Sequence, residues 1–290
     1  MTSTLRYPPT LSFDSLSRAD AAARFGFTSS ASQNPFPTVL VSLSGPIAPT
    51  LSQEKLNKST LQVLVRPLSN VPGTQEKYLA NIFSSVLECS ILGTANPRTL
   101  IQVVAQVLVP QGRYTGVGAG TVGRDKVLAS VINASTLTML NASSIPMRGV
   151  VCAVVVGRKQ KSGPTSSSSK YIVDPTDEES NSLDASGCFA FLFSDVLGKK
   201  TTGAAGSTCL WTSWHCYEGG IDETELEEVK GVGLEGAKEI WGYIVVGTHV
   251  PPVGSILYFT FMSTILSYLQ FAFTVVLTKD SSFSNRLTSS

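Results

Sequence analysis

An acidic turn is the first place in this sequence where chemistry could occur. Residues 174–180 read Asp-Pro-Thr-Asp-Glu-Glu-Ser, so four carboxylates lie close together behind a short strand-like stretch. Carboxylates grouped in this way can hold a divalent metal ion or transfer protons. A run of charges is more often a solvated turn, so the pattern alone favours a structural interpretation.

A glycine-rich stretch suggests a second kind of chemistry. Residues 116–123 read GVGAGTVG, which superficially resembles a nucleotide-binding loop. A phosphate-binding P-loop ends in Lys followed by Ser or Thr, and a dinucleotide-binding loop needs a strand before it and an acidic residue after it. The Lys-Ser ending is missing and the dinucleotide context is poor, so we predict a turn or flexible loop over residues 111–124.

Cysteine and histidine give little support for a metal site. The five cysteines are odd in number and form no CxxC pair. His215 adjoins Cys216, with Cys209 upstream, but a zinc site needs ligands spaced over hairpins or a helix, so we interpret these residues as a chance cluster. We predict no metal, no cofactor and a reduced intracellular protein. The N-terminus shows no basic region followed by an apolar core, so no secretory signal is expected.

Two further groups could contact a partner. The four basic side chains of residues 158–170 could touch RNA phosphates, although the serine-rich composition favours an exposed, solvated loop. Trp211 and Trp214 could pack in the core or at a subunit interface, and the sequence leaves both alternatives open.

These groups need a scaffold, and residues 60–99 organise it. Residues 60–66 alternate in the manner of a strand. Thr74 is the predicted N-cap of the helix that follows, because its hydroxyl can accept a free backbone N–H. A second strand is predicted over residues 100–109. The apolar stripe of the helix consists of Leu79, Ile82, Phe83, Val86 and Leu87.

The remaining elements complete a single α+β domain. A second helix is predicted over residues 125–143, and a last helix over residues 222–244 begins with a capping-box pattern at Asp222 and Glu225. The stripe of this last helix is Leu226, Val229, Gly233, Ala237, Ile240 and Ile244. Further strands are predicted at residues 38–43, 150–157, 171–173, 188–194 and 208–214.

The composition restricts the class of protein. With 290 residues, of which 42% are hydrophobic, the chain can build a substantial core. Charged residues make up 15% and the formal net charge is +1. A globally basic nucleic-acid-binding protein is therefore not indicated, and any RNA contact must come from a local patch.

Six short segments, in order, resemble one known family. They are SRADAAARF (17–25), VSLSGPIAPT (41–50), LQVLVRP (61–67), NPRT (96–99), IPMRGVVCAV (145–154) and VDPTDEE (173–179). Their order and spacing resemble the RNase PH-like core subunits of the eukaryotic RNA exosome. The resemblance covers roughly residues 11–244.

The resemblance implies a fold, partners and a location. The fold is RNase PH-like, of the ribosomal protein S5 domain 2-like type, with a mixed sheet and packed helices. The partners are five other RNase PH-like subunits in a hetero-hexameric ring around an RNA channel, S1/KH cap subunits, RNA and a separate hydrolytic nuclease. The expected location is the nucleus and nucleolus, and also the cytoplasm. The chain then divides into a flexible tail (1–10), the RNase PH-like domain (11–245) and an atypical extension (246–290).

The resemblance also implies that phosphorolytic chemistry is lost. Active members hold inorganic phosphate with a Gly-Thr-Arg turn at a helix start, and the phosphate-binding arginine falls on Val127 here. Asp125 at the same turn would repel phosphate, although Arg124 and Lys126 lie nearby and a shifted alignment could restore some positive charge. The helix that grips RNA in the family offers only Lys77 where several arginines are expected.

The acidic pair of the family is only partly retained. Asp174 matches the first carboxylate, whereas the second position is Ser180. Asp174 and Asp177 are then a degenerate remnant of the catalytic pair. The sequence thus predicts a non-catalytic ring subunit, with Arg113, Arg124 and Lys126 as candidates for RNA binding. The alternative is an active phosphate-dependent 3′–5′ exoribonuclease in which Asp174, Asp177 and Lys126 form an unorthodox site.

The end of the sequence departs from the family. Residues 254–278 are apolar and uncharged, and the run is long enough to span a bilayer. Three interpretations stay open, namely a tail anchor, a buried hairpin or subunit-contact arm, and a gene-model artefact that replaces the native end. The abrupt change in character favours the artefact. A membrane is expected as a partner only if this segment is genuine.

Overall fold

The structure is a computed structural model that describes residues 5–27, 38–69, 71–109, 119–159, 170–176, 178–194, 206–217 and 220–249. The chain divides into two compact units, Met1–Thr248 and His249–Ser290. The description below concerns the first unit, together with the last residue of helix α3, which ends at His249.

The first half of the chain forms a five-stranded sheet in the order β1-β2-β3-β5-β4. Strands β4 and β5 are parallel, and the other neighbours are antiparallel. Helix α1 (Thr74–Ser90) and the 3₁₀ turn η1 (Gly93–Ala95) connect β4 to β5. The strands are β1 (Thr10–Asp14), β2 (Ala21–Gly26), β3 (Val39–Ile47), β4 (Thr60–Arg66) and β5 (Leu100–Val107).

The second half forms another five-stranded sheet, in the order β10-β8-β6-β7, with β9 paired to β8. Its strands are β6 (Val150–Lys159), β7 (Tyr171–Val173), β8 (Leu183–Ser194), β9 (Gly206–Thr212) and β10 (His215–Cys216). The 3₁₀ turn η3 (Glu179–Ser182) links β7 to β8. Helix α2 (Ala119–Ala142) precedes this sheet in the chain, and helix α3 (Glu223–His249) follows it.

The predicted strand–helix–strand unit is confirmed, with one correction at the helix start. The whole predicted stripe of α1 is buried, and Val63 lies opposite Val103 in the parallel β4/β5 pair. The N-cap is Gly73, however, and Thr74 is the first helical residue. The carboxylate of Glu76 accepts the N–H of Gly73 at 2.7 Å, so an acidic side chain replaces the predicted hydroxyl cap.

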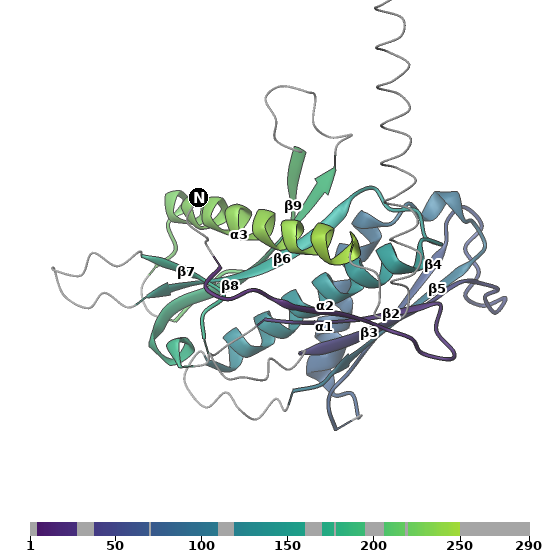
Figure 1. The fold of residues 1–290 in the computed structure, drawn as a ribbon, viewed down its shortest axis with the longest axis horizontal. Helices are drawn as coiled ribbons and strands as arrows, with labels where there is room; N and C mark the ends of the chain where they lie inside the picture. The colour runs from purple at the N-terminus through teal and green to yellow at the C-terminus, as the bar shows by residue number, and fades with distance from the viewer. Residues whose placement is uncertain are drawn as a thin grey trace, which may run out of the picture. The chain divides into compact units, whose positions relative to one another are not determined.

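Helix α2 lies between the two sheets and contacts β2 and β3 on one side and β6 and β8 on the other (Figure 1). It begins at Ala119, six residues before the predicted start, so the prediction of a loop up to residue 124 was wrong for its last part. Val122 is fully buried there, and this packing outweighs the low helix propensity of the two glycines in the first turn. Residues 110–118 lie outside the described part of the chain.

Buried polar side chains of α2 bond to both sheets. The amide of Asn133 donates to the carbonyl oxygen of Ala153 at 2.8 Å and accepts the Ala153 N–H at 2.7 Å. Thr136 donates to the carbonyl oxygen of Val151 at 2.8 Å, and Thr138 donates to that of Val41 in β3 at 3.3 Å. Asn133 therefore satisfies backbone groups of β6 beyond the short span that β7 pairs.

Helix α3 covers the second sheet on the face away from α2 (Figure 1). The ring of Trp241 stacks on Phe193 of β8 with centroids 5.8 Å apart. The predicted stripe is confirmed, since Val229, Ala237, Ile240 and Ile244 are fully buried. The predicted capping box is wrong in its second half, because the Glu225 carboxylate turns away from the helix start and binds Arg158.

The N-terminal segment differs from the predicted loose tail as far as it is described. Leu5 is buried, and its N–H donates to the Glu239 carboxylate of α3 at 2.9 Å. Strand β1 begins at Thr10 and pairs with β2, so residues 10–26 form a strand pair that the sequence pattern did not reveal.

No helix within the described ranges combines the length and the apolar character needed to cross a bilayer. The apolar run at residues 254–278 lies outside those ranges.

Candidate functional site

Asp174 stands directly after β7, at one end of the second sheet. Its backbone is in the left-handed region with φ 52°, and its N–H donates to the carbonyl oxygen of Val155 in β6 at 2.8 Å. Asp is one of the few residues that tolerate this conformation. Asp177, the second carboxylate of the predicted remnant, lies outside the described residues.

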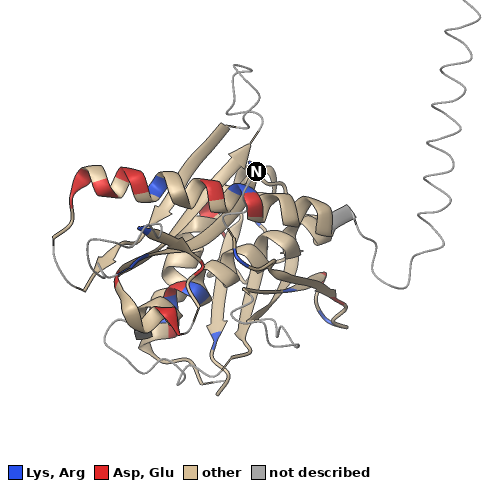
Figure 2. Ribbon diagram, turned by 60° about the vertical axis from the view of Figure 1, so that its left-hand side comes forward, with Lys and Arg blue, Asp and Glu red and all other residues tan. Residues whose placement is uncertain are grey.

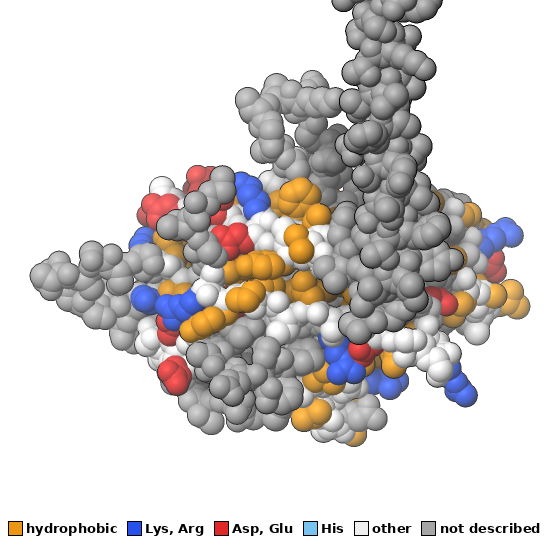
Figure 3. All heavy atoms as spheres, in the orientation of Figure 1, with side chains coloured by type: hydrophobic (Ala, Val, Ile, Leu, Met, Phe, Trp, Pro, Cys, Tyr) orange, Lys and Arg blue, Asp and Glu red, His pale blue; other side chains and the backbone are white. Residues whose placement is uncertain are grey.

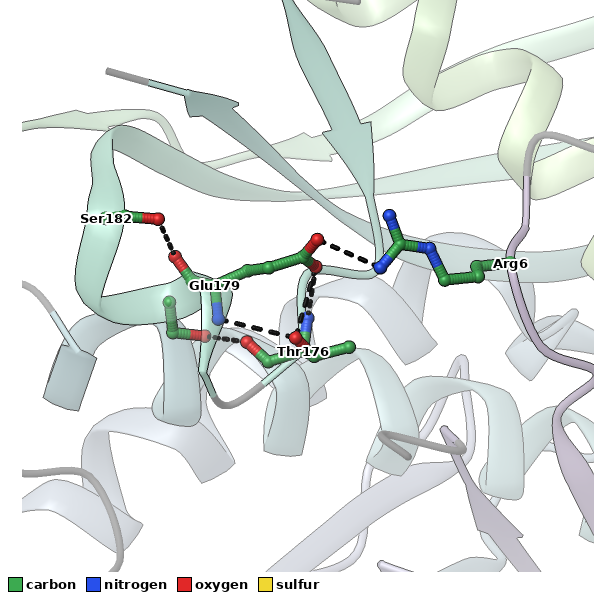
Figure 4. Close-up of polar contacts among 5 residues, drawn as sticks. Arg6, Thr176, Glu179 and Ser182 are labelled. Atoms are coloured by element: carbon green, nitrogen blue, oxygen red, sulfur yellow. Dashed lines mark hydrogen bonds and ion pairs between the residues drawn. The ribbon is translucent and has the colours of Figure 1, made fainter. Parts of the chain in front are cut away.

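Glu179 is held within its own turn (Figure 4). Its carboxylate accepts the Thr176 N–H at 3.0 Å and the Thr176 hydroxyl at 3.2 Å, and it pairs with the Arg6 guanidinium at 2.9 Å. Burial alone would raise the pKa of Glu179, but the Thr176 N–H and Arg6 together outweigh it and lower that pKa. Glu179 is therefore held by bonds within its own turn and by the Arg6 ion pair.

Ser180 is the residue that the sequence resemblance places at the second expected carboxylate position. Its side chain is buried, and its hydroxyl donates to the Thr176 carbonyl oxygen at 2.8 Å. Side chains of the turn thus bond to one another, and the Arg6 ion pair joins the turn to the N-terminal segment.

Asp125 lies buried in the second turn of α2, with 3% of its surface exposed. Its Oδ2 has no hydrogen-bond partner among the described residues. Burial raises the pKa of this carboxyl to about 7, although the neighbouring Arg124 lowers it in part. A carboxylate in this place opposes anion binding at the start of the helix, where phosphate would need positive charge.

Two weakly acidic groups, Tyr217 and Cys188, lie within electrostatic reach of Asp125. The Tyr217 hydroxyl lies 2.7 Å from the Ser186 hydroxyl, and burial raises the pKa of Tyr217 while its bonds to Ser186 and Thr121 oppose that rise. Burial, reinforced by the charge of Asp125, raises the pKa of the Cys188 thiol well above its usual value. Sequence reasoning did not single out Ser186 or Tyr217, because neither lies in a motif.

The structure connects the two halves of the predicted site through adjacent strands of the second sheet. The residue that binds the Asp174 N–H, Val155, pairs with Cys188 in β8, and Cys188 lies within electrostatic reach of Asp125. Helix α2 also contacts η3, which follows Asp174. The region therefore has the layout of a site that joins a helix start to an acidic turn.

The two described cations of the predicted RNA-binding set are poorly exposed. Arg124 is half-buried, and its guanidinium lies over the Tyr78 ring at 5.7 Å. Lys126 is 5% exposed, so its ammonium is poorly placed for a phosphate in solution. Val127 is packed into the hydrophobic core. Arg113 lies outside the described residues, so the three RNA-binding candidates stay predictions.

The basic segment has a structural role at both of its ends. Arg158 was predicted to lie in a loop, but it belongs to β6 and binds both Glu225 oxygens of α3, at 2.7 and 2.9 Å. Burial works against the charge of Arg158, yet Glu225 raises the pKa of its guanidinium. Lys170 pairs with Glu228 at 3.5 Å. Both ends of the segment thus hold α3 on the sheet, and residues 160–169 lie outside the described part.

The remaining candidates show packing and no convergent ligand set. Across the described ranges, no three His, Cys, Asp or Glu side chains converge as metal ligands would. Trp211 and Trp214 are half-buried against the core, and Trp214 lies 6.0 Å from the Phe189 ring. Both are therefore packing residues in the isolated chain.

Comparison with known proteins connects this geometry to one group. No protein-family model matches the chain. It is 36% identical over 123 residues to exosome complex component rrp46 of Schizosaccharomyces pombe, a match that covers 42% of this chain and 49% of that protein. It is 29% identical over 147 residues to exosome complex component RRP46 of Saccharomyces cerevisiae, covering 49% of this chain and 57% of that protein. The matched segments thus span about half the length of these curated relatives.

The fold has the same relatives among solved structures. Rice (Oryza sativa) Rrp46 gives a TM-score of 0.60 at 22% identity, over 82% of this chain and 92% of that one. The archaeal exosome core gives a TM-score of 0.52 at 14% identity, over 82% and 86%. The predicted RNase PH-like α+β fold is confirmed. Both curated relatives and the rice structure carry the name Rrp46.

Proposed function

Because this chain has the RNase PH-like fold and is related in sequence to the Rrp46 subunits of the exosome, we propose that it is a non-catalytic ring subunit of an RNA exosome. In this role it packs against five other RNase PH-like subunits, beneath S1/KH cap subunits. The ring guides RNA 3′ ends to a separate nuclease, and the role implies a location in the nucleus, nucleolus and cytoplasm.

One observation carries the non-catalytic part of the proposal. The first turns of α2, where the family binds phosphate, hold a buried carboxylate at Asp125 and a core side chain at Val127. Inorganic phosphate is a dianion near neutral pH and needs donors and cations at such a place. A carboxyl group that is itself half-ionised near pH 7 repels it.

The surface suits subunit contacts better than an open active site. Figure 3 shows hydrophobic side chains gathered in a band beneath α3. Large apolar residues are also exposed around the start of α1, where Val71 is 76% exposed and Tyr78 50%. Exposed apolar groups of this kind mark contact surfaces when they are contiguous.

Reconstitution tests the ring role. The chain is co-expressed with the other RNase PH-like subunits of its source, and the products are separated by size-exclusion chromatography. The expected result is a stoichiometric ring that contains this chain. If the chain stays alone while the other subunits associate with one another, the proposed role is wrong.

A second candidate function is phosphate-dependent exoribonuclease activity. The juxtaposition of Asp174 with the start of α2 favours it, because an active site would join the same two elements. The purified ring is incubated with single-stranded RNA and inorganic phosphate, and released nucleoside diphosphates are measured. The proposed function expects none.

A matched pair of variants makes this assay decisive. Asp174→Asn removes the charge while keeping a side chain that tolerates φ 52°. Glu178→Gln, at an exposed position in the same turn, serves as the control. Phosphate-dependent release that persists in Glu178→Gln and disappears in Asp174→Asn would establish the exoribonuclease instead.

A further inference from the structure

A preformed cavity lies away from the site described above, where the loop before β4, the end of α1 and the turn before β6 meet. Its volume is about 160 Å³, and its lining includes Lys58, Ser59, Ile91 and Arg148. An engineered cavity of about 150 Å³ can hold a benzene molecule, so this cavity has room for one side chain. Neither candidate function uses it.

Backbone hydrogen bonds fix the walls of the cavity. The Ser59 N–H donates to the Gly93 carbonyl oxygen at 2.8 Å, and the Arg148 N–H donates to that of Ser90 at 2.7 Å. An isolated bridge joins Ile91 to Met147. Three segments far apart in the sequence are thus tied together, and a ligand would enter a site that needs little ordering.

Two cations and two hydroxyls face one carboxylate around the cavity. Arg148 is exposed and forms no ion pair with any described residue. Among the residues that the structure describes, Lys58 has one loose ionic partner, Glu88, at 3.8 Å, and both of those side chains are half exposed. Ser59 and Thr94 add hydroxyl donors. The cavity therefore carries one positive charge in excess, and Ile91 supplies an apolar wall.

This combination selects among negatively charged ligands. A guanidinium binds a carboxylate through two parallel hydrogen bonds, and the apolar wall suits the methylene stem of an acidic side chain. A nucleic-acid backbone would carry a row of phosphates past Glu88, which would repel them. A single carboxylate on an aliphatic stem is the better match.

We propose that this cavity receives an Asp or Glu side chain of a neighbouring protein subunit, with Arg148 and Lys58 as the two cations that bind it. The inference rests on the proposed function, because it needs an assembly that brings a neighbour to this surface. On binding, Lys58 exchanges its loose partner Glu88 for the incoming carboxylate.

Carbodiimide cross-linking of the reconstituted ring tests the proposal, since it joins an amine to a carboxylate only when the two are in contact. In the isolated chain the reagent should couple Lys58 to Glu88. Glu88→Gln removes that internal acceptor. In the ring, the Glu88→Gln chain should then couple through Lys58 to an Asp or Glu of one neighbouring subunit, as read by mass spectrometry.

Matched variants separate the cavity from ordinary surface charge. Arg148→Ala, combined with Glu88→Gln, should lower the yield of the Lys58 cross-link about tenfold, because half of the clamp is missing. Arg66→Ala, at an exposed position at the end of β4, should leave the yield unchanged.

The outcomes distinguish the two proposals. If the ring forms but Lys58 gives no intersubunit cross-link, the cavity inference alone is overturned. The same holds if Arg148→Ala leaves the yield of the Lys58 cross-link unchanged. Protection of Lys58 by single-stranded RNA, with no protein cross-link, assigns the cavity to nucleic acid instead. A ring that does not form overturns the proposed function, and the cavity inference falls with it.

Discussion

Asp125 is the residue at which burial and charge oppose each other most directly. The unfolded chain ionises this carboxyl at about pH 3.8, whereas the folded chain retains its proton until about pH 7 because the carboxyl is buried. Between these values the folded state holds one more proton than the unfolded state. The free energy of unfolding therefore falls as the pH rises through this window.

Asp125→Asn should remove this loss of stability. A pKa displaced from 3.8 to about 7 corresponds to at most about 4 kcal/mol, so the variant should gain up to that amount at pH 8. The gain should shrink as the pH is lowered toward 4. Denaturant titrations of variant and wild type at pH 5 and pH 8 measure it.

Glu227→Gln, on the exposed surface of α3, is the control and should change stability little at either pH. If Asp125→Asn gave the same change at both pH values, the carboxyl would not titrate as described.

The Arg158–Glu225 pair differs from Asp125, because here each buried charge has an opposite charge as its partner. The two side chains are 14% and 12% exposed, so each would be a buried charge without the other. Glu225→Gln should lower the free energy of unfolding by about 3 kcal/mol, since breaking a buried pair leaves the arginine uncompensated. Urea titration at pH 7 measures the change.

Glu228→Gln provides the comparison, because its Lys170 pair is 3.5 Å long and more than half exposed. It should cost less than about 1 kcal/mol. Equal losses in the free energy of unfolding from both variants would mean that Arg158 becomes hydrated when Glu225 is removed.

At the scale of elements, helix α3 is weak by sequence and held by packing. Glycine is unfavourable in a helix interior, and the glycines of α3 differ in whether packing requires them. A methyl group at Gly236 would come within 2.8 Å of Val173 and 3.4 Å of Val154, whereas one at Gly231 would meet nothing within 4 Å. Gly236 therefore permits the close approach of α3 to the sheet, whereas Gly231 has no such packing role.

Two alanine substitutions should therefore have opposite signs. Gly231→Ala should stabilise the protein by about 0.5–1 kcal/mol through helix propensity. Gly236→Ala should destabilise it by about 1–3 kcal/mol through overpacking. Thermal unfolding followed by circular dichroism compares the two, and a loss of stability in Gly231→Ala would contradict the account.

The elements predicted from the sequence were those with a clear period. Alternation in β5 and the apolar stripes of α1 and α3 were sufficient, because each has one buried face. The start of α2 was missed because its first turn is glycine-rich and only packing makes it helical. The site was harder to predict from the sequence, since neither the burial of Asp125 nor the Arg158–Glu225 pair follows from local spacing.

At the scale of the whole molecule, charge is unevenly distributed. Figure 2 shows acidic residues repeated along α3. Four exposed members of this set are Glu223, Glu227, Glu228 and Glu235. An RNA backbone is repelled by such a face, so RNA should approach this chain from elsewhere.

Photo-cross-linking of RNA to the reconstituted ring should accordingly yield no peptide from residues 223–249. Peptides that carry Arg113, Arg124 or Lys126 are the expected alternative. Recovery of α3 peptides bound to RNA, at an efficiency that does not fall with added salt, would contradict the electrostatic argument.

The position of α2 has a consequence for how this chain can come apart. Asn133 and Thr138 fasten the helix to opposite sheets, so neither half of the fold retains a complete interior once the helix leaves. The amide protons of α2 should exchange with deuterium only through global unfolding of the domain. Proteolytic cleavage in a peripheral loop should therefore release no stable fragment. A substitution in α2 must be compatible with packing against both sheets.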